Sequence, residues 1–211
     1  SDSLYEQALN ECHEMLEIVR EMFNESIKTL RQSDTADIPI DIYAMDKKIN
    51  EFERDVRRKI MTHLAVSGKE DLGSGLILVS VVIDIERIGD YTKNIYDLAV
   101  QHPACLKGGT FEEKLNHIEQ ATMNFLNDAI DAFKNQDIEK ARKLMLDYKT
   151  DISSVSTEIV DSIISGKSGD FTSMEAGSLC LYARYLKRIA AHSRNLVSSI
   201  VNPFERIGYP E

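Results

Sequence analysis

Apolar residues recur every three or four positions along most of the chain, the spacing of one buried face of an α-helix. In the first such segment the stripe begins with Leu9, Cys12, Leu16 and Val19. Polar or glycine-containing stretches separate this segment from others of similar length, and the break at residues 166–170 separates the last two. The pattern predicts six helices, at residues 4–31, 40–66, 72–101, 111–135, 138–165 and 173–201.

The third segment allows two interpretations over its first half. Residues 76–83 are almost uniformly apolar, and periodicity alone does not separate a buried parallel strand from a buried helix. The next residues along the chain favour the helix, because Ile85, Ile88, Thr92 and Ile95 again step by three or four positions. We therefore predict one long helix that is buried on most sides in its first half.

Three pairs of segments resemble each other in the same order along the chain. Residues 5–10 match 111–116, residues 45–56 match 148–159, and residues 87–95 match 188–196, at offsets of 106, 103 and 101. An internal repeat of this kind predicts two copies of a three-helix unit, at residues 1–104 and 110–202, with a tail at 203–211. The predicted fold is all-α: two tandem three-helix bundles made of six long antiparallel helices.

Composition and charge narrow the class of protein. The chain has 211 residues with only 10 Gly and 4 Pro, which disfavours a turn-rich sandwich or barrel. Its formal net charge of −10 argues against binding a nucleic-acid backbone. The 3 cysteines form no C-x-x-C pair, as is usual in a reducing compartment. The longest uncharged apolar stretch is shorter than a membrane span, so we expect no membrane insertion.

Candidate chemistry is concentrated in the third helix, in the sequence Glu86-Arg87-Ile88-Gly89-Asp90. Glu86 and Asp90 are four residues apart, so both carboxylates lie on one helix face, where like charges repel unless a cation bridges them. Gly89 inside a helix costs about 1 kcal/mol relative to alanine, which indicates close approach by another helix or a ligand. Because carboxylate pairs at this spacing are common in an acidic chain, they are weak evidence alone.

The E-R-I-G-D string in the third of six helices resembles the motif of PhoU-type phosphate regulators. Residues 46–50 of the second helix, Asp-Lys-Lys-Ile-Asn, resemble that family's other acidic motif, and the two-copy repeat extends the resemblance over essentially the whole chain. The resemblance implies a cytoplasmic regulator that dampens the phosphate-starvation response. It also implies a homodimer that contacts a phosphate transporter subunit and a sensor kinase, and acidic motifs that can hold metal clusters.

We expect any metal to bind in the first repeat, between Asp46 and Asn50 on the second helix and Glu86 and Asp90 on the third. Oxygen ligands suit Mg²⁺, Ca²⁺ or Mn²⁺, and carboxylate clusters also bind iron; Zn²⁺ is left open too. No His follows a Glu at the Glu-x-x-His spacing of oxygen-activating di-iron proteins.

The second repeat departs from the family pattern at the matching positions. The repeat alignment places Lys149, Ser153, Lys187 and Ala191 where the first repeat has its four candidate ligands. Two lysines that face each other would repel a cation, so the alignment predicts two functionally unequal bundles. His192 aligns with Tyr91 and is interpreted as a half-buried ring rather than a ligand.

The sequence therefore favours a regulator of phosphate transport that acts by protein–protein contact and is not an enzyme. The absence of an initiator Met keeps open a second possibility, the cytosolic PhoU-like domain of a sodium–phosphate cotransporter. A metal-dependent hydrolase or oxidase is a remote alternative, because no nucleophile–base pair stands out. A purely structural dimerisation module is a further alternative.

Overall fold

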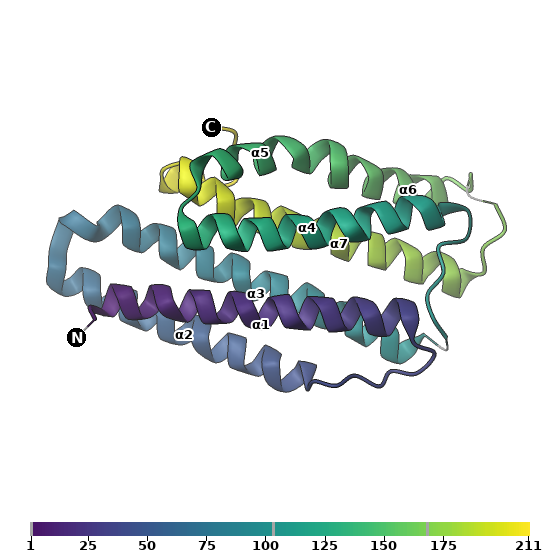
Figure 1. The fold of residues 1–211 in the computed structure, drawn as a ribbon, viewed down its shortest axis with the longest axis horizontal. Coiled ribbons are helices and arrows are strands. Elements are labelled where there is room, and N and C mark those ends of the chain that lie inside the picture. Colours follow the sequence, from purple (N-terminus) through teal and green to yellow (C-terminus); the bar gives the residue numbers. More distant parts are fainter. Residues whose placement is uncertain (1, 103, 168) are drawn as a thin grey trace.

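Helices form where the apolar pattern predicts them in the computed structural model, which describes residues 2–102, 104–167 and 169–211 (Figure 1). Ser1, Pro103 and Ser168 lie outside the described residues, the last of them within the predicted break at 166–170. These three ranges contain no β-strand, so the all-α prediction is confirmed and residues 76–83 are helical. The α-helices are α1 (Leu4–Gln32), α2 (Ile42–Ser67), α3 (Leu72–Gln101), α4 (Glu112–Asn135), α5 (Ile138–Tyr148), α6 (Ser154–Ile164) and α7 (Ser173–Val201).

Side-chain caps fix where the helices start. Ser3 accepts a hydrogen bond from the backbone N–H of Glu6, whose carboxylate accepts one from the N–H of Ser3, so a capping box opens α1. Asp41 caps α2 through the N–H of Ala44, which is why α2 begins at Ile42 and not at residue 40. No helix in the described ranges combines the length and the hydropathy that crossing a membrane requires.

The predicted fifth helix is interrupted. A π-helical turn at Lys149–Ser153 joins α5 to α6, so the segment from residue 138 to 164 is helical throughout but contains one wide turn. A π-turn inserts an extra residue and rotates the rest of the helix about its axis. Ile152 and Ile159 stay buried, as the apolar stripe predicts, whereas Val155 is only half-buried. The buried position after the turn is taken by Ser156, whose hydroxyl donates to the carbonyl of Ala183.

Two glycines let α2 pack closely on α3. A Cβ at Gly89 would lie 3.2 Å from Cδ1 of Ile49, and a Cβ at Gly75 would lie 2.9 Å from Cδ1 of Leu64. Both glycines have ordinary helical backbone angles. Glycine is favoured at these positions because any side chain would crowd α2. The predicted close approach at Gly89 is therefore confirmed, and its neighbour is a helix.

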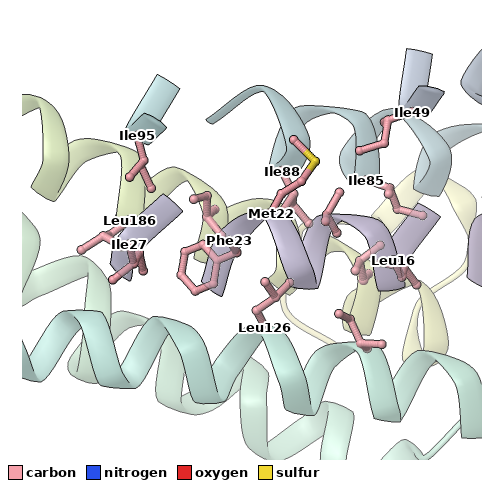
Figure 2. Packing of buried hydrophobic residues seen from close by; sticks show 14 of the residues in the cluster. Leu16, Met22, Phe23, Ile27, Ile49, Ile85, Ile88, Ile95, Leu126 and Leu186 are labelled. Atoms are coloured by element: carbon pink, nitrogen blue, oxygen red, sulfur yellow. The ribbon is translucent and has the colours of Figure 1, made fainter. Parts of the chain in front are cut away.

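The two halves of the chain form adjacent bundles, which meet mainly where α3 packs on α7 and α1 on α4 (Figure 1). The first is made of α1–α3 and the second of α4, α7 and the interrupted helix α5–α6, so each has three helical segments. Figure 2 shows Leu126 and Leu186 of the second half in the same apolar cluster as Phe23 and Ile27 of the first. The repeats are thus separate in topology but share a large apolar cluster, because α1 and α3 each present apolar faces to both bundles. A second, smaller cluster lies within the second repeat.

Candidate functional site

The antiparallel α2–α3 hairpin sets the acidic residues of the first repeat along one surface. Asp46, near the start of α2, is 8% exposed, and its carboxylate accepts a hydrogen bond from Nζ of Lys93 at 3.0 Å. The same Nζ lies 4.0 Å from a carboxylate oxygen of Asp90. Asp46 is therefore neutralised by Lys93, and it connects to Asp90 through that lysine.

Glu86 and Asp90 do come together. Their side chains are within hydrogen-bonding reach of each other, one helical turn apart on α3. Burial is the largest of the effects that raise the pKa of Glu86 to about 8; the hydrogen bond to Asp90 and the negative charges of Asp90 and Glu53 act in the same direction, and Arg87 opposes them. The pair therefore holds a proton that an exposed glutamate would lose near pH 4.5.

The cations near Glu86 and Asp90 neutralise the negative charge of this pair only in part. Arg87 is 3.8 Å from Glu86 and 3.9 Å from Asp90, but its side chain is 57% exposed. Burial lowers the pKa of Lys93, but the hydrogen bond to Asp46 and the nearby carboxylates outweigh it, so the pKa is raised overall and the amine stays charged. The negative charge of Glu86 is thus only partly compensated by the cations beside it.

Glu53 is a site residue that neither sequence motif contains. It is the acid on α2 whose charge acts on Glu86, and it also pairs with Arg57 at 3.2 Å. Asp46, Asn50 and Glu53 are spaced by four and three residues on one face of α2, so periodicity alone contained the signal. Asn50 is half-buried, and its side chain makes no hydrogen bond to the residues that the structure describes.

The side chains as placed do not form a complete metal site. In the part of the chain that the structure describes, no three His, Cys, Asp or Glu side chains converge as a ligand set. The oxygen donors suit a hard cation, but the carboxylate of Asp46 is paired with Lys93. Of the four predicted ligands, Glu86 and Asp90 are adjacent. Asp46 is linked to Asp90 by the amine of Lys93, which lies near both carboxylates.

The second repeat has no matching pair of lysines. Nζ of Lys187 donates to the hydroxyl of Thr157 at 2.9 Å, whereas Lys149 lies beside Arg194 and Met145. Lys187 and Arg194 are about two helical turns apart on α7, so the prediction that Lys149 and Lys187 face each other is wrong. The π-turn of the second repeat begins at Lys149.

A polar cluster joins the repeats at the α3–α7 contact. Nδ1 of His192 is 2.8 Å from Asp84, and Asn195 donates to the same carboxylate oxygen at 2.9 Å. The ring of His192 stacks on Tyr91, its counterpart in the repeat, with centroids 5.9 Å apart. The half-buried ring predicted for His192 is observed, and it contacts its counterpart of the first repeat where α3 packs on α7.

Duplicated three-helix bundles, an acidic α2–α3 surface and a polar α3–α7 junction define a tandem-repeat helical protein. The family model for the PhoU domain matches this chain twice, over residues 12–99 and 115–200. The chain belongs to the PhoU family, as the E-R-I-G-D motif and the repeat predict.

Curated relatives and solved structures agree with this assignment. The chain is 26% identical over 196 residues to a phosphate-specific transport system accessory protein PhoU homolog of Pseudomonas putida, covering 87% of this chain and 72% of the relative. A homolog of the same name from Pseudomonas aeruginosa is 23% identical over 188 residues, 87% of this chain and 76% of the relative.

Two crystal structures share the fold. PhoU from Pseudomonas aeruginosa superposes with a TM-score of 0.80 at 21% identity, over 94% of this chain and 95% of that one. The phosphate transport system regulatory protein PhoU from Streptococcus pneumoniae gives a TM-score of 0.70 at 20% identity, over 94% and 91%.

Proposed function

We propose that this protein is a cytoplasmic regulator of phosphate transport and phosphate-starvation signalling that acts through protein–protein contacts and catalyses no reaction. The observation that carries the proposal is the presence of both PhoU repeats in a fold that matches PhoU over 94% of the chain. The names of the relatives, accessory proteins of phosphate-specific transport, favour this role over a cotransporter domain.

The partners we propose are a second copy of the chain, a subunit of a phosphate ABC transporter and a sensor kinase. Large apolar side chains at the surface support binding of protein partners, since such residues gain free energy when a partner covers them. Val66 is 86% exposed, Leu146 78% and Met61 69%. Met61 and Val66 lie on α2 and Leu146 lies on α5, so more than one surface is available for contact.

Deletion and complementation in the source organism test this role. A strain without the gene should express a phosphate-starvation reporter even when phosphate is abundant, and the intact gene should restore repression. The purified protein should also bind the transporter's ATP-hydrolysing subunit in a pull-down with both proteins purified. Normal repression in the deletion strain, together with no binding to transporter or kinase, would refute the proposal.

We further propose a divalent or iron-type cation at the first repeat only. Glu86 and Asp90 would bind it, with Asn50 and Asp46 on the facing helix and Glu53 close by. The cation would supply the positive charge that the surrounding residues provide incompletely, a shortage that contributes to the raised pKa of Glu86. Asp46 would have to exchange its bond to Lys93 for the cation.

Thermal unfolding with and without added metal tests this site. A cation that binds only the native state raises the melting temperature by mass action. Glu86→Ala combined with Asp90→Ala should abolish the rise, and Lys187→Ala in the second repeat should preserve it. Elemental analysis of protein purified without chelator identifies the metal. An equal response in the double variant and the wild type would rule out this site.

A further inference from the structure

A groove in the second repeat lies outside the acidic surface of the first. It runs between α5, the π-turn, α7 and the C-terminal segment, and its volume is about 400 Å³. Its walls are mostly apolar side chains interrupted by cations. The lining includes Arg142, Met145, Leu146, Lys149, Arg194 and Tyr209.

The C-terminal segment is held in place as one wall of this groove. The N–H of Gly208 donates to the hydroxyl of Ser198 at 2.8 Å, in a backbone conformation with φ 90° that favours glycine. Asn202 donates to the carbonyl of Tyr209 at 2.8 Å. Glu211 accepts two hydrogen bonds from Arg142, at 2.6 and 2.5 Å. The wall is therefore fixed by several bonds.

Positive charge is in excess in the groove. Arg142 is paired with Glu211, the one carboxylate among the described lining residues. Lys149 is exposed and no carboxylate lies within ion-pair distance of it in the described ranges. The Cζ atom of Arg194 lies 4.5 Å from the ring centroid of Tyr148, but its buried Nε has no hydrogen-bond partner among described residues. Lys149 and Arg194 thus have no carboxylate partner among the described residues, in a chain of net charge −10.

The apolar part of the groove is unusually open to water. The side chain of Leu146 is 78% exposed and that of Tyr209 is 63% exposed. Covering such side chains gains about 25 cal/mol per Å² of apolar surface. The favoured ligand therefore combines apolar side chains with negative charge.

The chain's own C-terminal segment already shows this chemistry. Tyr209, Pro210 and Glu211 place an aromatic ring, a proline and a carboxylate against α5, with the carboxylate on Arg142. We propose that the groove binds an acidic linear segment of a partner protein, in which an aromatic or aliphatic side chain enters the cavity and carboxylates pair with Lys149 and Arg194. This surface does not depend on the role in phosphate transport proposed above.

Peptide selection followed by titration tests the groove. Random 12-residue peptides displayed on phage would be selected on the full chain, and enriched peptides would be synthesised and titrated by fluorescence anisotropy. We expect enriched peptides to carry Asp or Glu beside aromatic or aliphatic residues. Lys149→Glu and Leu146→Asp should each weaken binding by about tenfold, since charge reversal turns attraction into repulsion and a charge at Leu146 disfavours apolar burial.

The matched controls are Lys28→Glu on α1 and Val66→Asp on α2, which make the same changes at exposed positions away from the groove. Both should keep the dissociation constant within about twofold, because they lie outside the contact. The proposal would be overturned by no enriched peptide, by enriched peptides without acidic residues, or by equal weakening in the controls. It would also be overturned if the chain bound phosphatidylglycerol vesicles with the same dependence on Lys149 and Leu146, since the surface would then be a membrane contact.

Discussion

At the scale of single residues, Glu86 makes stability depend on pH. Its pKa in the folded protein is about 8, above the ordinary value of 4.5, so the native state holds a proton that the unfolded chain releases between these values. The native state binds more protons there, and stability therefore falls as the pH rises from about 4.5 to 8. Glu86→Gln, which cannot ionise, should raise the unfolding free energy by roughly 2 kcal/mol at pH 8 and little at pH 5.

Urea unfolding of chelator-treated protein at the two pH values measures this difference. Glu21→Gln on an exposed position of α1 is the control and should leave the pH dependence unchanged. An equal effect of Glu86→Gln at both pH values would show that the shared proton is absent.

The bond between Lys93 and Asp46 gives a second prediction at this scale. Lys93→Met leaves the Asp46 carboxylate, which is 8% exposed, without its cation and should cost roughly 2 kcal/mol. Adding Asp46→Asn removes the unpaired charge, so the double variant should be more stable than Lys93→Met alone. Chemical denaturation of Lys93→Met, Asp46→Asn and the double variant measures the cycle, and wild-type stability of Lys93→Met would contradict the pairing.

The residues of the site show what a sequence can and cannot reveal. Spacing placed Glu86 and Asp90 on one face of α3, and the structure brings their carboxyls together. Spacing along the sequence did not show that Asp46 is opposite Lys93. That pairing depends on the register of the α2–α3 hairpin and thus on the turn between the helices. Glu53 was missed because it lies outside both motifs, although its spacing from Asp46 was available.

At the scale of elements, the π-turn explains why one helix follows its predicted stripe only in part. Apolar periodicity correctly predicted that residues 138–165 are helical and that Ile152 and Ile159 are buried. It did not predict the π-turn, because one extra residue in a turn alters the spacing of apolar residues very little. The turn is stabilised by contacts from elsewhere in the fold. His117 on α4 approaches the carbonyl of Asp151, with 3.1 Å between the atoms. Such tertiary contacts are not encoded within the segment itself.

Deleting one residue of this turn gives a prediction for the element. Removal of exposed Thr150 should convert the π-turn to α-helix while both flanking faces keep their positions, at a cost below about 2 kcal/mol. Removal of exposed Glu51 from the regular helix α2 is the control. It rotates the rest of that helix by about 100°, takes Ile60 out of the core, and should prevent folding. Circular dichroism and thermal melts distinguish the two deletion variants. An unfolded Thr150 deletion would show that the π-turn does not contain a removable extra residue.

At the scale of the whole molecule, the two repeats are joined by more than apolar packing. Arg31 at the end of α1 is 8% exposed at its side chain and lies 2.5 Å from both Glu112 and Glu119 on α4. Glu119 also accepts a hydrogen bond from the buried hydroxyl of Tyr182 on α7 at 2.6 Å. Repeat detection shows where the copies begin, but a shared interior of this kind depends on which faces the helices leave for the other bundle.

The whole chain should therefore unfold in one cooperative transition, because neither bundle can lose its structure without exposing Phe23 and Leu126, which lie in one core. Arg31→Met should lower the melting temperature of that single transition and cost about 3 kcal/mol, since it leaves Glu112 and Glu119 without their cation. Arg58→Met, at a side chain that is 70% exposed, is the control and should change stability by less than about 0.5 kcal/mol. Differential scanning calorimetry measures both effects. Two resolved transitions in the wild type, or a transition that Arg31→Met splits in two, would show that the repeats are independent folding units.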